Sequence, residues 1–373
     1  MAQEPTGGGA RGDEAALLHE ARWWRPIGRD KLLCYLCPRL CEVGPGQAGF
    51  CFIRQNRQGR LYSLGYGRST GFAVDPIEKK PLNHFLPGTN VLSFGTAGCN
   101  LGCKFCQNWN ISKARFAERS SEPATPEKVV ELAQAAGSEG IAYTYNEPVI
   151  WAEYAIDVAR AARAVGLKNV MVTAGYVTPE ARPEVFEYMD AANVDLKAFT
   201  ESFYRGFTLS HLQPVLDTIA WLRETDVWTE VTTLLIPGLN DGAQEITEEC
   251  DWIVEHMGPN VPVHFTAFHP AFKMINRPRT PVRTLQMARE IAHQRGVRFC
   301  YVGNVHDSEA QATVCPSCRE VLIRRDWHAI QHYGLVGNRC PRCNEVIPGV
   351  FHEGPHRGEE RRTSGGRYRV RLA

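Results

Sequence analysis

Residues 90–112 read NVLSFGTAGCNLGCKFCQNWNIS, a short apolar run that leads into three closely spaced cysteines. The run at 90–96 is typical of a buried strand, and Cys99, Cys103 and Cys106 follow it in a C-x3-C-x2-C pattern. Three thiolates suit an iron–sulfur cluster better than a lone zinc ion, which prefers four ligands. On a [4Fe–4S] cluster they leave one iron open to a small chelating molecule. The alternative is a zinc site completed by a distant ligand.

The chain beyond this stretch alternates between short β-rich runs and helical runs. We expect strands at 90–96, 140–144, 169–173, 193–197, 228–236, 262–268 and 297–302. We expect helices at 126–137, 147–166, 210–225 and 281–296. Strands and helices that alternate in this way form parallel βαβ units, and six or seven units give an open or closed α/β barrel. The sequence therefore places the three cysteines in the loop after the first strand, at the end where such barrels gather their chemistry.

Most of the other cysteines fall into two further groups. The N-terminal group is Cys34, Cys37, Cys41 and Cys51, and the C-terminal group is Cys315, Cys318, Cys340 and Cys343. The C-terminal group consists of two C-x2-C pairs and predicts a structural zinc site of the zinc-ribbon kind, with a rubredoxin-like iron site as the alternative. The N-terminal spacing predicts either zinc or a second iron–sulfur cluster, with zinc slightly favoured. Cys250 and Cys300 stand alone and are interpreted as buried apolar residues.

The composition limits which binding partners and which cellular compartment we expect for this protein. The net charge of +1 gives no global field that would draw the protein to nucleic acid, although arginines near the C-terminus leave weak nucleic-acid contact open. No apolar run approaches the length of a membrane span, so we expect no membrane contact. The N-terminus lacks the features of a secretion signal, which predicts a cytoplasmic protein with reduced thiols.

The motifs divide the chain into five segments. We expect residues 1–29 to be disordered apart from a short amphipathic helix at 14–24, and residues 30–89 to form a Cys-rich metal-binding segment. Residues 90–305 are the expected barrel core, and residues 306–351 the zinc-ribbon-like unit. Residues 352–373 are charged and Gly-rich, and we expect a disordered tail.

Taken together and in order, these motifs resemble the radical S-adenosylmethionine (SAM) superfamily. More narrowly, the chain is similar to the radical SAM member of the AmmeMemoRadiSam system, a relative of the pyruvate formate-lyase activating enzymes. The resemblance runs from about Cys34 to Phe351. It is carried by CYLCPRLCEVGPGQAGFC, CNLGCKFCQNWNIS, YTYNEP, NVDLKAF, LLIPGLND, FHPAFKM, YVGN and the C-terminal CPSC and CPRC. It implies a partial (β/α) barrel that uses SAM and a [4Fe–4S] cluster held by the central cysteines.

The resemblance also implies roles for single residues. Glu147, in the NEP motif, corresponds to the residue that holds the SAM amino group; the alternative is an acidic side chain in the first turn of a helix. Asp195 and Lys197 match a DLK motif, and they face the barrel mouth to contact SAM or substrate unless they form only a structural ion pair. Ala174 replaces an asparagine of the family pattern, and we assign it no binding role. Roles for three rim residues stay open: Asn240, Asp241 and His269.

The implied reaction begins when a low-potential electron donor, flavodoxin- or ferredoxin-like, reduces the cluster. SAM is then cleaved to methionine and a 5′-deoxyadenosyl radical, which abstracts hydrogen from a substrate that the sequence does not identify. Genes for Memo-like and AMMECR1-like proteins commonly accompany relatives of this chain, which implies a shared pathway. Two alternatives remain: a glycyl-radical-enzyme activating enzyme, and a non-enzymatic iron–sulfur and zinc protein that senses redox state or binds nucleic acid. The SAM-motif set argues against the second.

Overall fold

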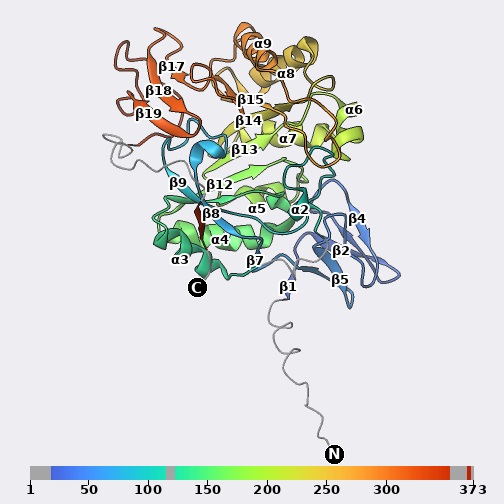
Figure 1. Cartoon of the computed structure of the whole chain (residues 1–373). Helices are drawn as coiled ribbons and strands as arrows, with labels where there is room; N and C mark the ends of the chain where they lie inside the picture. Colours follow the sequence, from blue (N-terminus) through green and yellow to red (C-terminus); the bar gives the residue numbers. More distant parts are fainter. Residues whose placement is uncertain (1–17, 115–121, 353–367, 371–373) are drawn as a thin grey trace, which may run out of the picture.

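The computed structural model of the chain describes residues 18–114, 122–352 and 368–370, and a mostly parallel sheet forms its centre (Figure 1). The described part of this sheet has nine strands in the order β16-β15-β14-β13-β12-β11-β9-β8-β20. The parallel strands are β9 (Asn90–Phe94), β11 (Gly140–Tyr143), β12 (Lys168–Thr173), β13 (Ala191–Asp195), β14 (Trp228–Leu235), β15 (Val263–Ala267) and β16 (Cys300–Gly303). At one end of the sheet, β8 (Phe72–Pro76) pairs antiparallel with β9 and with the edge strand β20 (Tyr368–Val370). The predicted succession of parallel strands is confirmed, and the barrel is a partial one.

Helices connect the parallel strands as the alternating pattern predicts. They are α2 (Trp109–Ser112), α3 (Pro126–Ala135), η2 (Pro148–Trp151), α4 (Ala152–Ala164), α5 (Arg182–Phe186), α6 (Glu201–Phe203), η3 (Tyr204–Thr208), α7 (Gln213–Leu222), α8 (Ala243–Met257) and α9 (Val282–Gln294). At the start of α3, the Thr125 side chain accepts a hydrogen bond from the Lys128 backbone, and Pro126 opens the helix. The sequence analysis did not anticipate α8. Among the described helices, none combines the length and the apolar character that a membrane span requires.

The segment between β8 and β9 fills the end of the barrel where the parallel strands begin. It contains η1 (Ile77–Lys79), and its apolar residues Leu82 and Phe85 pack with Val91, Ala142 and other residues near the strand starts. His84 lies in the same segment, and its ring is 2.6 Å from the hydroxyl of Tyr301 in β16. The barrel is therefore closed at this end by its own chain.

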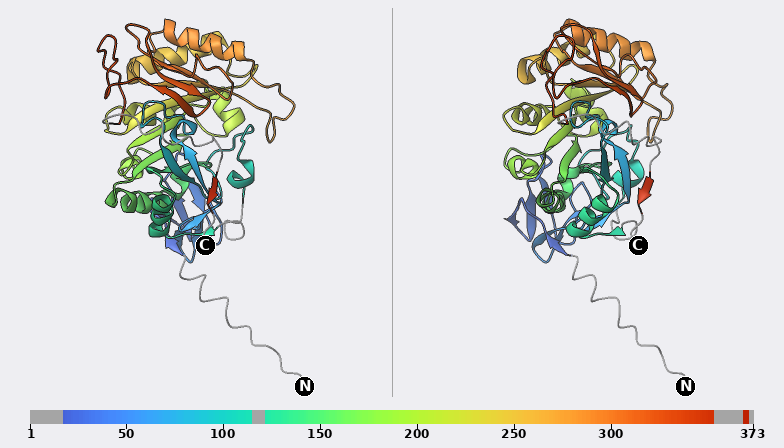
Figure 2. Two further views of the ribbon diagram at one scale, coloured as in Figure 1. Left: turned by 60° about the vertical axis from the view of Figure 1, so that its left-hand side comes forward. Right: turned by 90° about the vertical axis from the view of Figure 1, so that its left-hand side faces the viewer.

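A C-terminal unit packs against β16 and against the segment between β8 and β9 (Figures 1 and 2). It contains the antiparallel strands β17 (Thr313–Val314), β18 (Val321–Asp326) and β19 (Ala329–Tyr333). Arg325 of β18 is buried and donates a 2.8 Å hydrogen bond to the carbonyl of Asn83, in the segment that fills the barrel. We call this unit, residues 313–351, the ribbon. It joins β16 to the β8 side of the sheet, where no strand pairing closes the barrel within the described residues.

The N-terminal cysteines lie in a pair of small sheets on the other side of the molecule, drawn in blue in Figure 1. One sheet contains β1 (His19–Glu20), β6 (Arg60–Ser63) and β5 (Arg54–Arg57), and the other contains β2 (Trp24–Gly28), β3 (Lys31–Cys34) and β4 (Cys41–Val43). A two-stranded sheet joins β7 (Arg68–Ser69) to β10 (Glu122–Pro123). These sheets contact α4 through a buried ion pair between Arg54 and Glu153, 2.9 Å apart.

The expected helix at 14–24 is wrong for its described residues. The backbone of Ala21 donates to the carbonyl of Leu61, and the carbonyl of Trp23 accepts from Tyr35, so this stretch forms inter-strand hydrogen bonds. Trp23 has a φ of 56°, which a helix does not tolerate, and Pro26 lies in β2. The amphipathic pattern reflects one face packed on a sheet.

Two further expectations about the segments of the chain can be compared with the structure. The central sheet begins at β8, inside the segment 30–89 that we expected to be separate from the barrel core. Most of the expected terminal disorder concerns residues 1–17, 353–367 and 371–373, which lie outside the described residues. Within the expected tail, β20 is a strand that pairs with β8, because an exposed sheet edge offers it free backbone groups.

Candidate active site

The three central cysteines face a cavity of about 260 Å³ at the carboxyl end of the sheet. Cys103 is buried, whereas Cys99 and Cys106 are partly buried. The backbone N–H of Leu101 lies 3.4 Å from the Cys99 sulfur, and the Ser112 hydroxyl lies 3.2 Å from that of Cys106. Burial raises the pKa of Cys99 to about 11 and that of Cys103 to about 12. The thiols therefore need a bound cation to be thiolates near neutral pH, as a metal-binding site requires.

The spacing of this trio fits a cluster better than a single ion. Among the described residues, the C-terminal cysteines are the only group of three or more Cys, His or carboxylate side chains whose ligating atoms all lie within 4.8 Å of one another. The sulfurs of the trio are thus spread more widely than the ligands of one zinc ion. A four-iron cluster binds each cysteine to a different iron, which suits the wider arrangement.

Two glycines allow the cysteine loop to pack closely on both sides. Gly98 has a φ of +87°, and a Cβ there would clash with the carbonyl oxygen of Cys51 from the N-terminal group. A Cβ on Gly102 would lie 2.5 Å from a methyl group of Leu209. The N–H of Gly102 also donates to the carbonyl of Thr208 at 2.7 Å. The loop is therefore clamped between the N-terminal sheets and the segment after η3.

Glu147 lies in the same cavity at the end of the loop that follows β11. Its carboxylate accepts hydrogen bonds from the Thr173 hydroxyl at 2.5 Å and from the Ala174 backbone at 2.7 Å. It also caps η2 through the N–H of Val149, so the helix-start interpretation holds together with a place in the cavity. Burial raises the pKa of Glu147 to about 6, although its hydrogen bonds and Lys197 favour the charged form. Glu147 is therefore ionised at neutral pH and able to accept from an ammonium group.

Sequence reasoning missed what Asn146 and the Ala174 backbone do. The Asn146 side chain accepts from the Thr96 backbone at 3.1 Å and donates to the Gly98 carbonyl at 2.9 Å. It thereby ties the Glu147 loop to the loop that carries the cysteines. Ala174 departs from the family pattern only in its side chain, while its N–H orients Glu147. The NEP motif indicated Asn146, but only the fold shows that it acts on the cysteine loop.

Asp195 and Lys197 both line the cavity and also form an ion pair. The Lys197 ammonium is 2.6 Å from the Asp195 carboxylate at the end of β13. Burial alone would lower the pKa of Lys197, but Asp195 and the neighbouring thiols of Cys103 and Cys106 raise it above its usual value. The ion pair of the structural alternative is therefore present in a cavity wall, and contact with SAM or substrate stays a prediction. A cation beside the cysteines favours their thiolate form.

The three rim residues that the sequence left unassigned lie outside the cavity lining. Asn240 bonds the backbone of Ile236 at 2.7 Å and the Lys197 carbonyl at 3.0 Å, and Asp241 accepts from Gly238 at 2.8 Å. They shape the loop after β14. His269 lies 3.4 Å from the carbonyl of Asn304.

A second cavity of about 340 Å³ adjoins the first; we call it the chamber. The two cavities share the lining residues Gln107, Asn108, Thr144, Tyr145, Thr266 and Asn304. The chamber extends into the barrel between β15, β16 and the segment after β8, and residues of the ribbon complete its wall. The basic groups in its wall are Lys79, Lys80, His264, Arg325 and His328. No sequence motif indicated this set, because its members come from three distant parts of the chain.

Cationic groups outnumber anionic ones around the chamber. Lys79 and Lys80 share one carboxylate, that of Asp75, at 2.5 and 2.8 Å. Arg325 is 3.8 Å from Glu78, whose pKa burial raises to about 7, so Glu78 is only partly ionised at neutral pH. His264 pairs with the Glu230 carboxylate at 2.6 Å, and burial lowers the pKa of His328, so neither histidine adds to the net charge of the chamber. The two lysines and Arg325 leave a small excess of positive charge, which favours an anionic occupant.

The two flanking cysteine groups differ in geometry. In the ribbon, the sulfurs of Cys315 and Cys343 are 3.5 Å apart and those of Cys318 and Cys340 are 3.6 Å apart. This close approach suits tetrahedral binding of one metal ion. The N-terminal four lie where β3, β4 and the following loop meet, beside the loop of the central trio.

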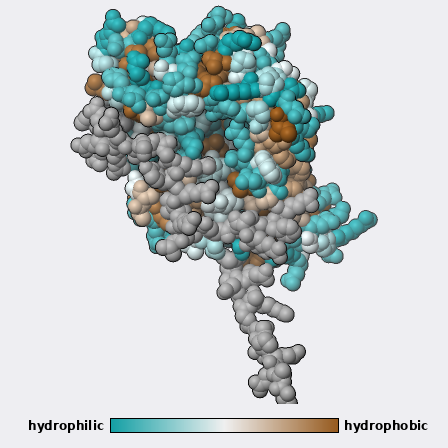
Figure 3. Space-filling view, in the orientation of Figure 1, coloured by the Kyte–Doolittle hydropathy of each residue, from teal (hydrophilic) through white to brown (hydrophobic). Residues whose placement is uncertain are grey.

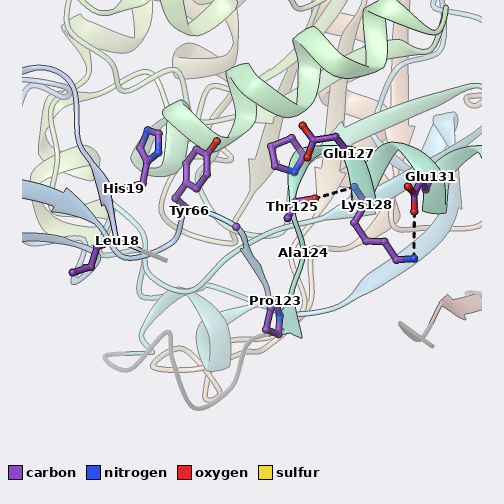
Figure 4. A pocket seen from close by; sticks show the side chains of 11 residues that line it. Leu18, His19, Tyr66, Pro123, Ala124, Thr125, Glu127, Lys128 and Glu131 are labelled. Atoms are coloured by element: carbon purple, nitrogen blue, oxygen red, sulfur yellow. Dashed lines mark hydrogen bonds and ion pairs between the residues drawn. The ribbon is translucent and has the colours of Figure 1, made fainter. Parts of the chain in front are cut away.

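A further hollow of about 550 Å³ lies beside the start of α3 (Figure 4). His19 stacks on Tyr66 there with ring centroids 3.7 Å apart, and Lys128 pairs with Glu131. None of the predicted site residues lines this hollow. The face in Figure 3 is largely hydrophilic and is hollowed near its centre.

A partial parallel barrel with a C-x3-C-x2-C loop after its first parallel strand defines a class of cluster-dependent enzymes. The chain belongs to the radical SAM superfamily, whose family model matches residues 94–250. It is 39% identical over 332 residues to the uncharacterized protein MJ0808 of Methanocaldococcus jannaschii, an alignment that covers 88% of this chain and 99% of the relative. The expected superfamily and enzyme class are thus confirmed. The use of a [4Fe–4S] cluster and SAM, and the need for an electron donor, follow from the family.

More distant relatives include activating enzymes. The chain is 24% identical over 178 residues to the pyruvate formate-lyase-activating enzyme of Listeria monocytogenes, which covers 45% of this chain and 70% of the relative. It is 22% identical to the 4-hydroxyphenylacetate decarboxylase activating enzyme of Clostridioides difficile, over 45% of this chain and 55% of that protein. Among solved structures, a domain of the pyruvate-formate lyase-activating enzyme of Bacteroides vulgatus matches at 17% identity with a TM-score of 0.40, covering 45% of this chain and all of that one.

Proposed function

We propose that this radical SAM enzyme holds its [4Fe–4S] cluster through Cys99, Cys103 and Cys106 and abstracts hydrogen from a small anionic substrate bound in the chamber. The observation that carries the proposal is the continuity of two cavities. The first is lined by the trio together with Glu147, Asp195 and Lys197, and the second opens from it. A cluster with one iron free of thiolate supplies, when bound, the electron that cleaves SAM to methionine and a 5′-deoxyadenosyl radical.

The residues around the first cavity bind and orient SAM. Glu147 accepts from its amino group, because the Glu147 carboxylate is buried and held in place by three donors. Lys197 and Asp195 hold a charge pair at the cavity wall, where they contact SAM or the substrate. Asn146 positions the cysteine loop relative to Glu147. No side chain has to act as an acid or a base in the cleavage.

The chamber supplies the substrate site. It is polar and cationic, and it meets the SAM cavity along Tyr145 and Asn304. A substrate that carries a carboxylate or phosphate gains charge-assisted hydrogen bonds from Lys79 and Arg325 while it directs a C–H bond to the first cavity. The ribbon takes part directly through Arg325, Trp327 and His328.

Several finer assignments complete the proposal. The C-terminal four cysteines bind zinc, because their sulfurs are as close as one tetrahedral ion requires. The electron donor is a flavodoxin- or ferredoxin-like protein, the pathway includes Memo-like and AMMECR1-like proteins, and the enzyme is cytoplasmic. The family's need for an electron donor supports the first assignment, and the resemblance of the motifs to the AmmeMemoRadiSam radical SAM proteins supports the second. The clustered cysteines, which require a compartment that keeps thiols reduced, support the third.

Activation of a glycyl-radical enzyme is the second candidate function. The likeness to two activating enzymes favours it. It requires a partner peptide to reach the first cavity, and it gives the chamber no small-molecule role. An EPR doublet from a glycyl radical on a co-purified partner would select it.

The first test is anaerobic reconstitution with iron, sulfide, SAM and dithionite, followed by quantification of 5′-deoxyadenosine. Cys103→Ala removes a cluster ligand and should abolish the product while zinc content is unchanged. Cys250→Ala removes a buried cysteine outside all three groups and is the matched control, which should retain the product. The proposal fails if the reduced wild-type protein leaves SAM intact, or if its central trio holds only zinc.

The second test addresses the substrate. A cell extract is separated by charge, and each fraction is added to the reconstituted enzyme while 5′-deoxyadenosine formation is followed. The anionic fraction should raise the rate of 5′-deoxyadenosine formation. Lys79→Met should raise the half-maximal concentration of this fraction by about tenfold, because the substrate loses the affinity that one charge-assisted hydrogen bond provides. Lys128→Met, on the surface of α3, is the control. Stimulation by the neutral fraction alone would refute the anionic substrate.

A further inference from the structure

The N-terminal cysteines are arranged for a ligand that is larger than one metal ion. Cys34 ends β3, Cys41 begins β4, Cys37 lies in the turn between them, and Cys51 follows on the next loop. Cys34 and Cys51 are buried, and the other two are partly buried. Backbone N–H groups are directed at three of the sulfurs: that of Arg39 at Cys37, that of Phe50 at Cys41 and that of Ile53 at Cys51. Donors of this kind stabilise thiolates that are bound to metal.

The three cysteine groups of the chain provide an internal comparison of spacing. A zinc ion with bonds of about 2.3 Å holds its sulfurs roughly 3.8 Å apart. The ribbon group matches this distance, with sulfur pairs at 3.5 and 3.6 Å. Within the described part of the chain, no three sulfurs of the N-terminal four lie within 4.8 Å of one another, and the same holds for the central trio of the radical SAM site. The N-terminal group thus resembles the cluster site and differs from the zinc-like one.

The N-terminal group also lies against the central cysteine loop. Gly98, next to Cys99, packs so closely on the carbonyl of Cys51 that a Cβ there would clash. The Cα atoms of Cys51 and Cys99 are therefore on the order of 10 Å apart or less, since consecutive Cα atoms are about 3.8 Å apart. The guanidinium of Arg39, between Cys37 and Cys41, donates to the carbonyls of Asn100 and Leu209. Packed backbone thus connects the two groups without a gap.

We propose that Cys34, Cys37, Cys41 and Cys51 hold a second [4Fe–4S] cluster that passes electrons to the cluster at Cys99, Cys103 and Cys106. This role rests on the proposed function. One electron leaves a reduced ferredoxin- or flavodoxin-like protein, resides on the N-terminal cluster and then moves to the central one. The donor is oxidised and the central cluster is reduced, and no bond forms or breaks in the transfer.

The test counts metals in the full-length protein after anaerobic reconstitution. Wild type should contain about eight iron atoms, about eight acid-labile sulfides and about one zinc per chain. Cys41→Ala should lower iron to about four and leave zinc near one, and Cys103→Ala should do the same through the other cluster. Cys340→Ser is the control for the ribbon, and it should lower zinc without loss of iron. EPR of the reduced wild type should show two interacting S = 1/2 centres, and each cluster variant should show one.

Two outcomes separate this inference from the proposed function. If wild type contains about four iron and two zinc and still forms 5′-deoxyadenosine, the N-terminal site is a zinc site and the inference is wrong. If two clusters are present but SAM stays intact, the second cluster stands and the proposed function fails. The electron path is tested by the ratio of rates with reduced flavodoxin and with dithionite. Cys41→Ala should lower this ratio at least about tenfold, and an unchanged ratio would overturn the relay.

Discussion

Removal of the charge on Glu153 should loosen the N-terminal sheets from the barrel. Arg54 and Glu153 are each only 2% exposed, and both carboxylate oxygens accept from the same guanidinium nitrogen at 2.9 and 3.0 Å. Glu153 also accepts from the backbone of Arg22 at 2.7 Å. Glu153→Gln keeps the size of the side chain but leaves the Arg54 charge buried without a counter-ion. Breaking a buried pair in this way costs about 3–5 kcal/mol.

Hydrogen exchange on the cluster-loaded protein measures this loss where it occurs. In peptides that cover β5, the exchange rates should rise roughly 150- to 5000-fold, since each 1.36 kcal/mol is a factor of ten. Glu131→Gln, the same substitution in the exposed pair with Lys128, should change the rates by about twofold or less. A rise below tenfold for Glu153→Gln, or an equal rise in both variants, would refute the reasoning. Replacement of the pair by Met at Arg54 and Leu at Glu153 should recover most of the protection.

Three further changes test the site and the core. Because burial raises the pKa of Glu147 to about 6, SAM binding to the oxidised protein should weaken by up to about tenfold per unit as the pH falls below 6, and Glu147→Gln should give a weaker but flat profile in equilibrium dialysis. Gly98→Ala, with a φ of +87° and a clash against backbone, should lose at least half of its bound iron, whereas Gly206→Ala, with open space around it, should retain the wild-type content. Burial also raises the pKa of Glu249 to about 8, so its contribution to stability is fully present below its unfolded pKa and is lost as the pH rises through 8. Glu249→Gln should therefore gain stability relative to wild type between pH 5 and 8 in thermal unfolding, and a constant difference over that range would contradict the shift.

Local patterns were sufficient to predict the barrel. Each parallel strand is a short apolar run that ends near a polar motif, so the expected 140–144 and 262–268 regions match β11 and β15 to within a residue or two. The loop positions of the central cysteines follow from the same pattern. The pairing of Asp195 with Lys197 was anticipated as one of two alternatives, because residues two apart at a strand end face the same side.

The chamber could not be predicted, because its walls come from segments that no local pattern connects. Lys79 precedes the first parallel strand and Arg325 follows the last one, and only the packing of the ribbon on the segment after β8 brings them to one cavity. The failed helix at 14–24 has a similar cause. Its apolar face packs on a strand, and sequence periodicity over so short a stretch does not distinguish this from a helix.

The bond from Arg325 to the Asn83 carbonyl has a thermodynamic consequence. It makes β18 both a neighbour of the four ribbon cysteines and a wall of the chamber, where we propose that the substrate binds. If a metal bound to these cysteines stabilises the strand in place, it should raise the affinity for a molecule in the chamber, and by reciprocity that molecule should raise the affinity for the metal by the same factor. Chelator resistance of the ribbon thus becomes a way to screen for the unknown substrate without any turnover.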